Sequence, residues 1–119
     1  LNATFAGLIA TASGYGLITD GGDIPNNQVL RFVNMLVATN AQCQQFAPSF
    51  GNLNICAYDA GNGASTCYGD EGGPLTVTRN GRRILVGIKS FVSPLSCRLG
   101  EPVAFVRITS YIDWINRFL

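Results

Sequence analysis

The sequence predicts an all-β domain, either a barrel or a sandwich, from three observations. Short runs rich in β-branched and aromatic residues recur along the chain. Glycine, asparagine and proline separate these runs, which is typical of strands joined by turns. Only the C-terminal segment carries the spacing of apolar residues that indicates a helix.

The expected elements follow one another in a simple order. The strand candidates are residues 3–13, 29–37, 75–78, 84–90 and 103–108. Asn80-Gly81, between the third and fourth candidates, indicates a two-residue hairpin turn because both residue types tolerate a positive φ. Ser110 and Asp113 have the spacing of a capping box and predict the start of a short helix. The apolar face of that helix would be Ile112, Ile115, Phe118 and Leu119.

The composition describes one globular domain. The chain has 119 residues, of which 47% are hydrophobic and 13% charged, and this balance excludes a disordered protein. The net charge of +1 is too small to indicate nucleic acid or an acidic membrane as a partner. No apolar run approaches the roughly 20 residues of a membrane span, and the first residues do not read as a signal peptide. We therefore expect a chain that starts inside a mature protein.

Cysteine usage points to an oxidising compartment. The four cysteines allow three disulfide pairings, and their spacing does not choose among them. They are Cys43, Cys56, Cys67 and Cys97. The chain has no histidine, so a zinc site would need all four cysteines in one cluster, and we expect neither a metal nor a cofactor. Asn2 begins the sequon Asn-Ala-Thr and is a candidate glycosylation site. A secreted, extracellular protein is the expectation.

One run carries the functional argument. Residues 67–75 read Cys-Tyr-Gly-Asp-Glu-Gly-Gly-Pro-Leu. This run resembles the nucleophile loop of chymotrypsin-like serine proteases, Cys-x-Gly-Asp-Ser-Gly-Gly-Pro-Leu, with Glu71 in place of the attacking serine. A serine hydroxyl is a poor nucleophile until a neighbouring base takes its proton, and this chain has neither that serine nor any histidine. The resemblance implies a homologue that does not hydrolyse peptides.

Further motifs extend the resemblance over nearly the whole chain. Residues 14–16 match the Gly-Trp-Gly of the family, residues 55–57 its Ile-Cys-Ala, and residues 85–88 the strand that leads into residues 90–92. Residues 100–115 look most like arthropod chymotrypsin- and collagenase-type members. The resemblance implies that residues 1–119 form a six-stranded antiparallel Greek-key barrel with a short C-terminal helix. This is the C-terminal barrel of a two-barrel fold, and we expect the N-terminal barrel, which carries the histidine and aspartate of the family, to be absent from this chain.

The resemblance also implies the disulfides and the remnant of an oxyanion hole. The family pairing corresponds to Cys43 with Cys56 and to Cys67 with Cys97. The amides of Gly69 and Glu71 match the oxyanion-hole donors. These donors can bind the Glu71 carboxylate itself and plug the site, or Glu71 can simply point to solvent from its turn, and the sequence does not choose.

Asp70 matches the aspartate that pairs with a newly exposed amino terminus in activated members of the family. Without that amine, a buried Asp70 must find other donors, or its loop must relax toward a zymogen-like state, because an unpaired buried carboxylate is costly. An exposed Asp70 is the alternative.

The specificity pocket is also assigned by resemblance. Ser65 matches the base of the pocket, where trypsin-like members have aspartate. Ser90, Phe91 and Val92 match the segment that pairs with a substrate backbone. Val92 and Val103 fall near the pocket walls, although Val103 can equally be ordinary barrel core. Apolar, medium-sized side chains are the expected guests.

The resemblance therefore favours a binding role, as a cofactor, decoy or carrier. One alternative is a chain of a split or processed endopeptidase whose other chain carries histidine and aspartate, and another is a storage, structural or venom component. The apolar face that packs on the other barrel needs a cover. We expect a complementary N-terminal-half chain or a homodimer there, and a peptide or small ligand as occupant of the remnant pocket. Nucleic acid and membrane are not expected partners.

Overall fold

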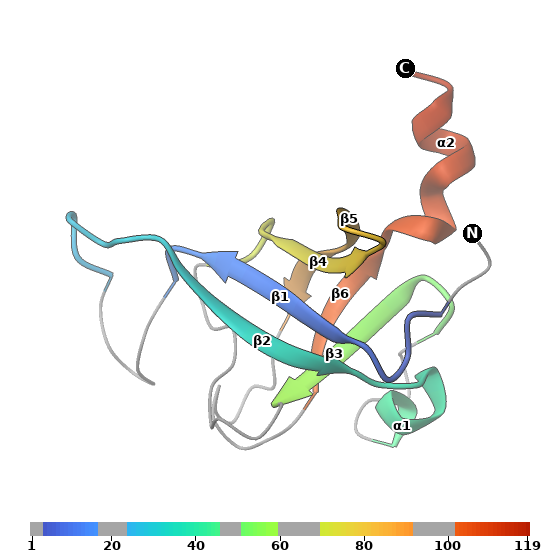
Figure 1. The fold of residues 1–119 in the computed structure, drawn as a ribbon, viewed down its shortest axis with the longest axis horizontal. Coiled ribbons are helices and arrows are strands. Elements are labelled where there is room, and N and C mark those ends of the chain that lie inside the picture. The colour runs from blue at the N-terminus through green and yellow to red at the C-terminus, as the bar shows by residue number, and fades with distance from the viewer. Residues whose placement is uncertain (1–3, 17–23, 46–50, 60–69, 92–101) are drawn as a thin grey trace.

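The fold is an antiparallel barrel. The computed structural model describes residues 4–16, 24–45, 51–59, 70–91 and 102–119. Within them, six strands close in the order β1-β2-β3-β6-β5-β4, with two short α-helices outside the barrel (Figure 1). The predicted six-stranded antiparallel barrel is confirmed. The strands are β1 (Ile9–Gly14), β2 (Arg31–Val37), β3 (Asn54–Asp59), β4 (Pro74–Arg79), β5 (Arg82–Phe91) and β6 (Val103–Arg107).

Two strand predictions differ from the structure. The first strand starts at Ile9 and not at residue 3, because Phe5 and Gly7 have φ of 63° and 84° and turn the chain before it. Strand β3 was not among the candidates. It owes its place in the sheet to two partners, since it pairs with β2 on one side and β6 on the other.

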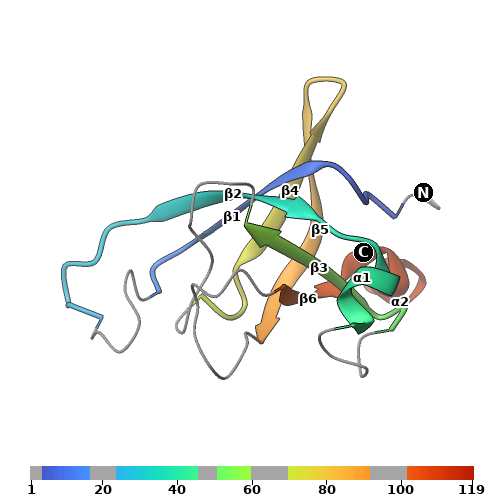
Figure 2. The same ribbon diagram turned by 90° about the horizontal axis from the view of Figure 1, so that it is seen from below.

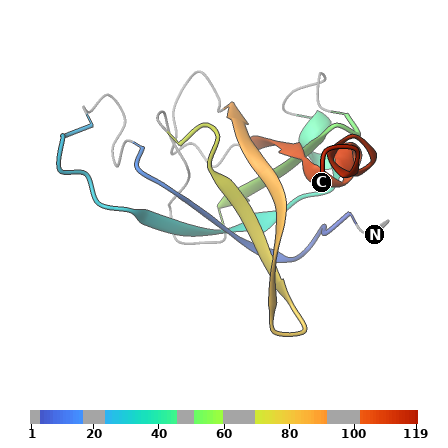
Figure 3. The ribbon, with the colours of Figure 1, turned by 90° about the horizontal axis from the view of Figure 1, so that it is seen from above.

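The predicted hairpin turn is confirmed. Asn80 and Gly81 have φ of 51° and 76° and join the paired residues Arg79 and Arg82. Positive φ at both central residues gives the turn a twist that matches the flanking strands. The hairpin of β4 and β5 projects away from the barrel, as Figures 2 and 3 show.

The barrel interior is apolar and closely packed. Its largest fully buried side chains are Phe105, Met35, Ile55, Leu75, Val37 and Val86. Gly87 lies against this core, where a Cβ would come within 2.9 Å of the Cβ of Phe105. A glycine is therefore required at this point of β5.

An irregularity in β5 changes which side chains face inward. Gly87 pairs with Leu75 and Leu85 pairs with Thr76, so Val86 is an extra residue in the strand. A bulge of this kind shifts the alternation of a strand by one residue. As a result Val86 is buried before the shift, and Gly87 and Lys89 are buried after it. The bulge is what places a lysine inside the barrel.

The helices differ from the sequence prediction in where they are capped. Helix α1 (Asn40–Gln44) has a capping box, in which the Thr39 side chain and the Gln42 side chain each accept from the other residue's backbone. The capping box predicted at Ser110 is wrong, because Ser110 instead donates to the backbone oxygen of Asn52. The C-terminal segment first forms a 3-10 turn (Ile108–Tyr111) and then α2 (Ile112–Asn116), without a side-chain cap. None of the helices in the described residues has the length and apolar character to cross a membrane.

The predicted apolar face of the C-terminal helix is only partly covered. Ile112 and Ile115 are half-buried, whereas Phe118 is 71% exposed and Leu119 is exposed as well. Trp114 is also exposed, and its ring lies 4.8 Å from that of Phe118. Helix α2 points away from the barrel in Figure 1, which leaves this aromatic pair uncovered.

Candidate functional site

The loop that carries Glu71 is fastened to the backbone of Lys89 on β5. Gly72 N donates to Lys89 O at 3.0 Å, and Lys89 N donates to Gly73 O at 2.8 Å. The loop is closed by a further bond of 3.0 Å from Gly73 N to Asp70 O, and Gly72 has a φ of 84° that favours glycine. These bonds fix the position of the loop relative to the end of β5.

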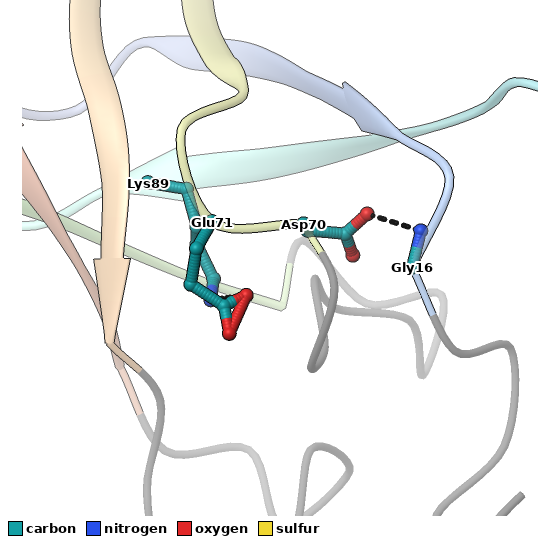
Figure 4. Close-up of polar contacts among 4 residues, drawn as sticks. All are labelled: Gly16, Asp70, Glu71 and Lys89. Carbon is teal, nitrogen blue, oxygen red and sulfur yellow. Dashed lines mark hydrogen bonds and ion pairs between the residues drawn. The ribbon is translucent and has the colours of Figure 1, made fainter. Parts of the chain in front are cut away.

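The side chain of Lys89 continues from this backbone to the carboxylate of Glu71 (Figure 4). Lys89 Nζ lies 3.8 Å from Glu71 Oε2. The lysine side chain is 1% exposed and the glutamate side chain 44% exposed. The distance is that of an ion pair and is too long for a hydrogen bond. Among the residues that the structure describes, this buried Nζ has no hydrogen-bond partner.

Burial dominates the protonation of Lys89. Desolvation lowers the pKa of Lys89 below its ordinary value of 10.5, and the charge of Glu71, followed by that of Asp70, only partly opposes this. A buried cation is costly unless it is both paired and hydrogen-bonded. Within the described part of the chain, Lys89 has a carboxylate at ion-pair distance and no hydrogen bond of ordinary length, so its burial is only partly compensated.

The carboxylate of Asp70 accepts a hydrogen bond from the backbone just beyond the end of β1, away from Lys89. Gly16 N donates to Asp70 Oδ1 at 2.8 Å, so this carboxylate has found a donor within the chain. A Cβ on Gly14 or on Gly16 would come closer than 3.0 Å to the Asp70 carboxylate, which explains glycine at both positions. Figure 4 shows the side chains of Asp70 and Glu71 diverging, and they do not converge on one substrate.

The other predicted site residues divide into two groups. Ser90 is exposed near the end of β5, and the backbone of Phe91 ends that strand. Val103 is 3% exposed and belongs to the core of the barrel. The remaining candidates lie outside the described residues. They are Asn2, Ser65, Cys67, Gly69, Val92 and Cys97.

One of the two predicted disulfides is confirmed. Cys43 of α1 is bonded to Cys56 of β3, with 6.4 Å between their Cα atoms. The bond attaches α1 to the barrel wall. The pairing of Cys67 with Cys97 stays a prediction.

Sequence reasoning missed Lys89. It considered only a plugged oxyanion hole or a solvent-facing side chain for Glu71, and the structure adds a buried lysine as its ionic partner. One signal was present. Lys89 directly follows the apolar run Ile-Leu-Val-Gly-Ile and directly precedes the Ser-Phe-Val segment.

Comparison with known proteins gives one consistent result. The sequence profile of the trypsin family matches residues 3–115. A collagenase of Hypoderma lineatum is 36% identical over 118 residues, which are 98% of this chain and 43% of that protein. Serine protease 1 of Drosophila melanogaster is 42% identical over 112 residues, which are 94% of this chain and 40% of that protein.

A solved structure agrees with these sequences. The structure of HL collagenase superposes with a TM-score of 0.81 at 36% identity and covers 98% of this chain and 48% of that one. The chain thus spans less than half the length of each protein compared with it here. It corresponds to one barrel of their fold.

Proposed function

Because this chain belongs to the trypsin family, as the match over residues 3–115 shows, we propose that it is a catalytically silent, secreted member that acts by binding. The observation that carries the proposal is Glu71 in the nucleophile loop. A carboxylate there has no hydroxyl to attack a peptide carbonyl, and the chain has no histidine to serve as a base.

Two structural features support a silent site. The Glu71 carboxylate already faces the buried Lys89 amine, so it is engaged with a cation of the same chain. The Asp70 carboxylate is turned toward Gly16 and does not join Glu71 as an acid-base pair. Secretion is supported by the disulfide between Cys43 and Cys56, because such bonds persist in oxidising compartments.

Peptide hydrolysis tests the silent site. We expect no turnover of chymotrypsin-, elastase- or trypsin-type peptide substrates and no labelling by a serine-directed fluorophosphonate. Labelling or turnover that disappears in Glu71→Gln would contradict the proposal. A known protease assayed in parallel shows that the substrates and the probe are competent.

The length of the match supports a second candidate, one chain of a split or processed endopeptidase. This chain covers only 43% of the Hypoderma collagenase and 40% of the Drosophila protease. A second chain with the histidine and aspartate can correspond to the part of those proteins that this chain does not match. Glu71→Ser separates the candidates. In native material, a gain of fluorophosphonate labelling in this variant requires a histidine from a partner, whereas continued inertness supports the binding protein.

A cover for the exposed apolar side chains is part of the proposal. Phe32 is 73% exposed at β2, and Trp114 is 59% exposed on α2. We propose a complementary barrel or a second copy of the chain as the cover, because monomeric proteins rarely expose large apolar patches. Light scattering of the native material should give a mass above 12.7 kDa. A monomer that does not bind a hydrophobic dye would contradict this cover.

A further inference from the structure

Among the described residues, the amine of Lys89 has a charge partner but no hydrogen-bond partner, and this mismatch indicates a ligand. We propose that Lys89 is a carboxylate-binding centre for an acidic side chain of a peptide ligand, and that Glu71 occupies this centre while no ligand is bound. The inference rests on the proposed binding function and names the chemistry of the ligand.

The donors of Lys89 Nζ are not satisfied by the described residues. A lysine ammonium has three donors, and Nζ is buried without a hydrogen-bond partner within the described part of the chain. The 3.8 Å to Glu71 Oε2 neutralises part of the charge but satisfies none of these donors. A carboxylate that approached to hydrogen-bond distance would gain a charge-assisted bond that Glu71 does not make in this arrangement.

The two side chains of the Lys89–Glu71 pair differ in exposure. The Lys89 side chain is buried in the barrel, and both its backbone N and its backbone O are held by the loop at residues 72–73. The Glu71 side chain is 44% exposed and has solvent on one side. Glu71 can therefore turn outward and remain hydrated, while Lys89 stays in place to receive another carboxylate.

The charge balance around Lys89 determines which ligand fits. Exchange of the Glu71 carboxylate for that of a ligand leaves the net charge around Lys89 unchanged, whereas a cationic or neutral group would leave the buried ammonium without a counter-charge. Asp70 also acts on Lys89 electrostatically, and this second negative charge disfavours a polyanion. A single carboxylate on an acidic side chain fits best.

Peptide titration tests the assignment. The probes are the capped tripeptides acetyl-Ala-Ala-Glu-amide and acetyl-Ala-Ala-Gln-amide, added at pH 7 to the full chain and followed by NMR or calorimetry. Glu71→Gln removes the internal competitor, and we expect about a fivefold to tenfold tighter binding of the Glu peptide, from the worth of one partly exposed ion pair. Binding of the Gln peptide should not change.

Lys89→Met provides the decisive comparison. It should abolish the preference for the Glu peptide over the Gln peptide, both alone and together with Glu71→Gln. Arg82→Met is the matched control, because it removes an exposed cation at the hairpin tip, and it should keep the preference. If Glu71→Gln fails to fold, the comparison of the unchanged chain with Lys89→Met decides the question.

Two outcomes would overturn the assignment. One is equal binding of the two peptides by Glu71→Gln, and the other is a preference for the Glu peptide that survives Lys89→Met. Hydrolysis is measured on the same samples. A chain that cleaves nothing and shows no preference for the Glu peptide would refute the Lys89 centre and leave the silent-site proposal intact.

Discussion

Two buried cations on neighbouring strands are stabilised in different ways. Lys89 on β5 pairs in register with Phe105, two residues along β6 from Arg107. Arg107 donates from Nε to Asn54 O at 2.9 Å and from its two terminal nitrogens to Thr4 O and Asn40 Oδ1, each at 3.1 Å. Lys89 has a carboxylate 3.8 Å away and, among the residues described, no hydrogen-bond partner for its amine.

The difference follows from the shapes of the two side chains. The planar guanidinium carries five donors in a fixed fork, so neutral oxygens from several elements can satisfy it. Burial lowers the pKa of the Arg107 guanidinium below its ordinary value, yet the group remains charged at neutral pH. The lysine ammonium is a compact charge that depends on a counter-ion. Arg107 therefore joins β3, α1 and the N-terminal segment, whereas Lys89 is expected to add little or nothing to the stability of the fold.

Substituting each cation by methionine tests this contrast most directly. Arg107→Met should raise the free energy of the folded state by about 3 to 5 kcal/mol, because it leaves three partly buried oxygens without a donor. Lys89→Met should be neutral or stabilising, because an apolar side chain of similar length replaces a buried cation whose counter-charge is 3.8 Å away. Urea denaturation of the two variants measures both. Equal destabilisation by the two substitutions would remove the distinction.

The disulfide should support the Arg107 side of the comparison. Cys43 lies in α1, the helix that begins at the Arg107 partner Asn40. Replacing Cys43 and Cys56 by alanine should cost about 3 kcal/mol through the loop that the bond closes. In that variant the penalty of Arg107→Met should shrink, because α1 is less firmly held. A penalty that is the same with and without the disulfide would show that the two tethers act independently.

Removal of the Glu71 charge tests how much the ion pair with Lys89 contributes to stability. Glu71→Gln should destabilise the protein by about 1 to 3 kcal/mol at pH 7, less than for a fully buried pair because Glu71 is half-exposed. The same substitution in a Lys89→Met background should have a smaller effect. A double-mutant cycle from urea denaturation gives this difference, and a zero coupling would mean that the 3.8 Å pair contributes nothing.

The pH dependence of stability is the smallest expected effect. Because the pKa of Lys89 is lower in the folded chain than 10.5, the unfolded chain binds more protons between the folded pKa and 10.5. Stability should therefore rise with pH across that window, relative to Lys89→Met. In Glu71→Gln the window should extend to lower pH, because Asp70 alone then opposes desolvation. A difference from Lys89→Met that stays constant with pH would contradict the assignment.

Much of the fold could be predicted because it depends on local chemistry. Asn80-Gly81 specifies its turn through residues that tolerate positive φ, and the prediction was correct. The predicted start of the first strand was wrong because Phe5 has a positive φ, which a phenylalanine in a sequence does not indicate. The cap at Ser110 was wrong because its hydroxyl bonds to Asn52, which is 58 residues away in sequence.

The sequence by itself determined that this chain is an all-β domain without histidine, and its resemblance to a known family predicted the barrel, because a motif and a composition are properties of the residues alone. It did not determine the partner of Glu71. A lysine in a strand is ordinarily expected on the solvent side, and only the bulge at Val86 turns Lys89 inward. That bulge arises from the pairing of β5 with β4, and the burial that lowers the pKa of Lys89 arises from closure of the barrel around it. The tertiary structure alone therefore decided the electrostatics of the site, because desolvation depends on every strand that excludes water from Nζ.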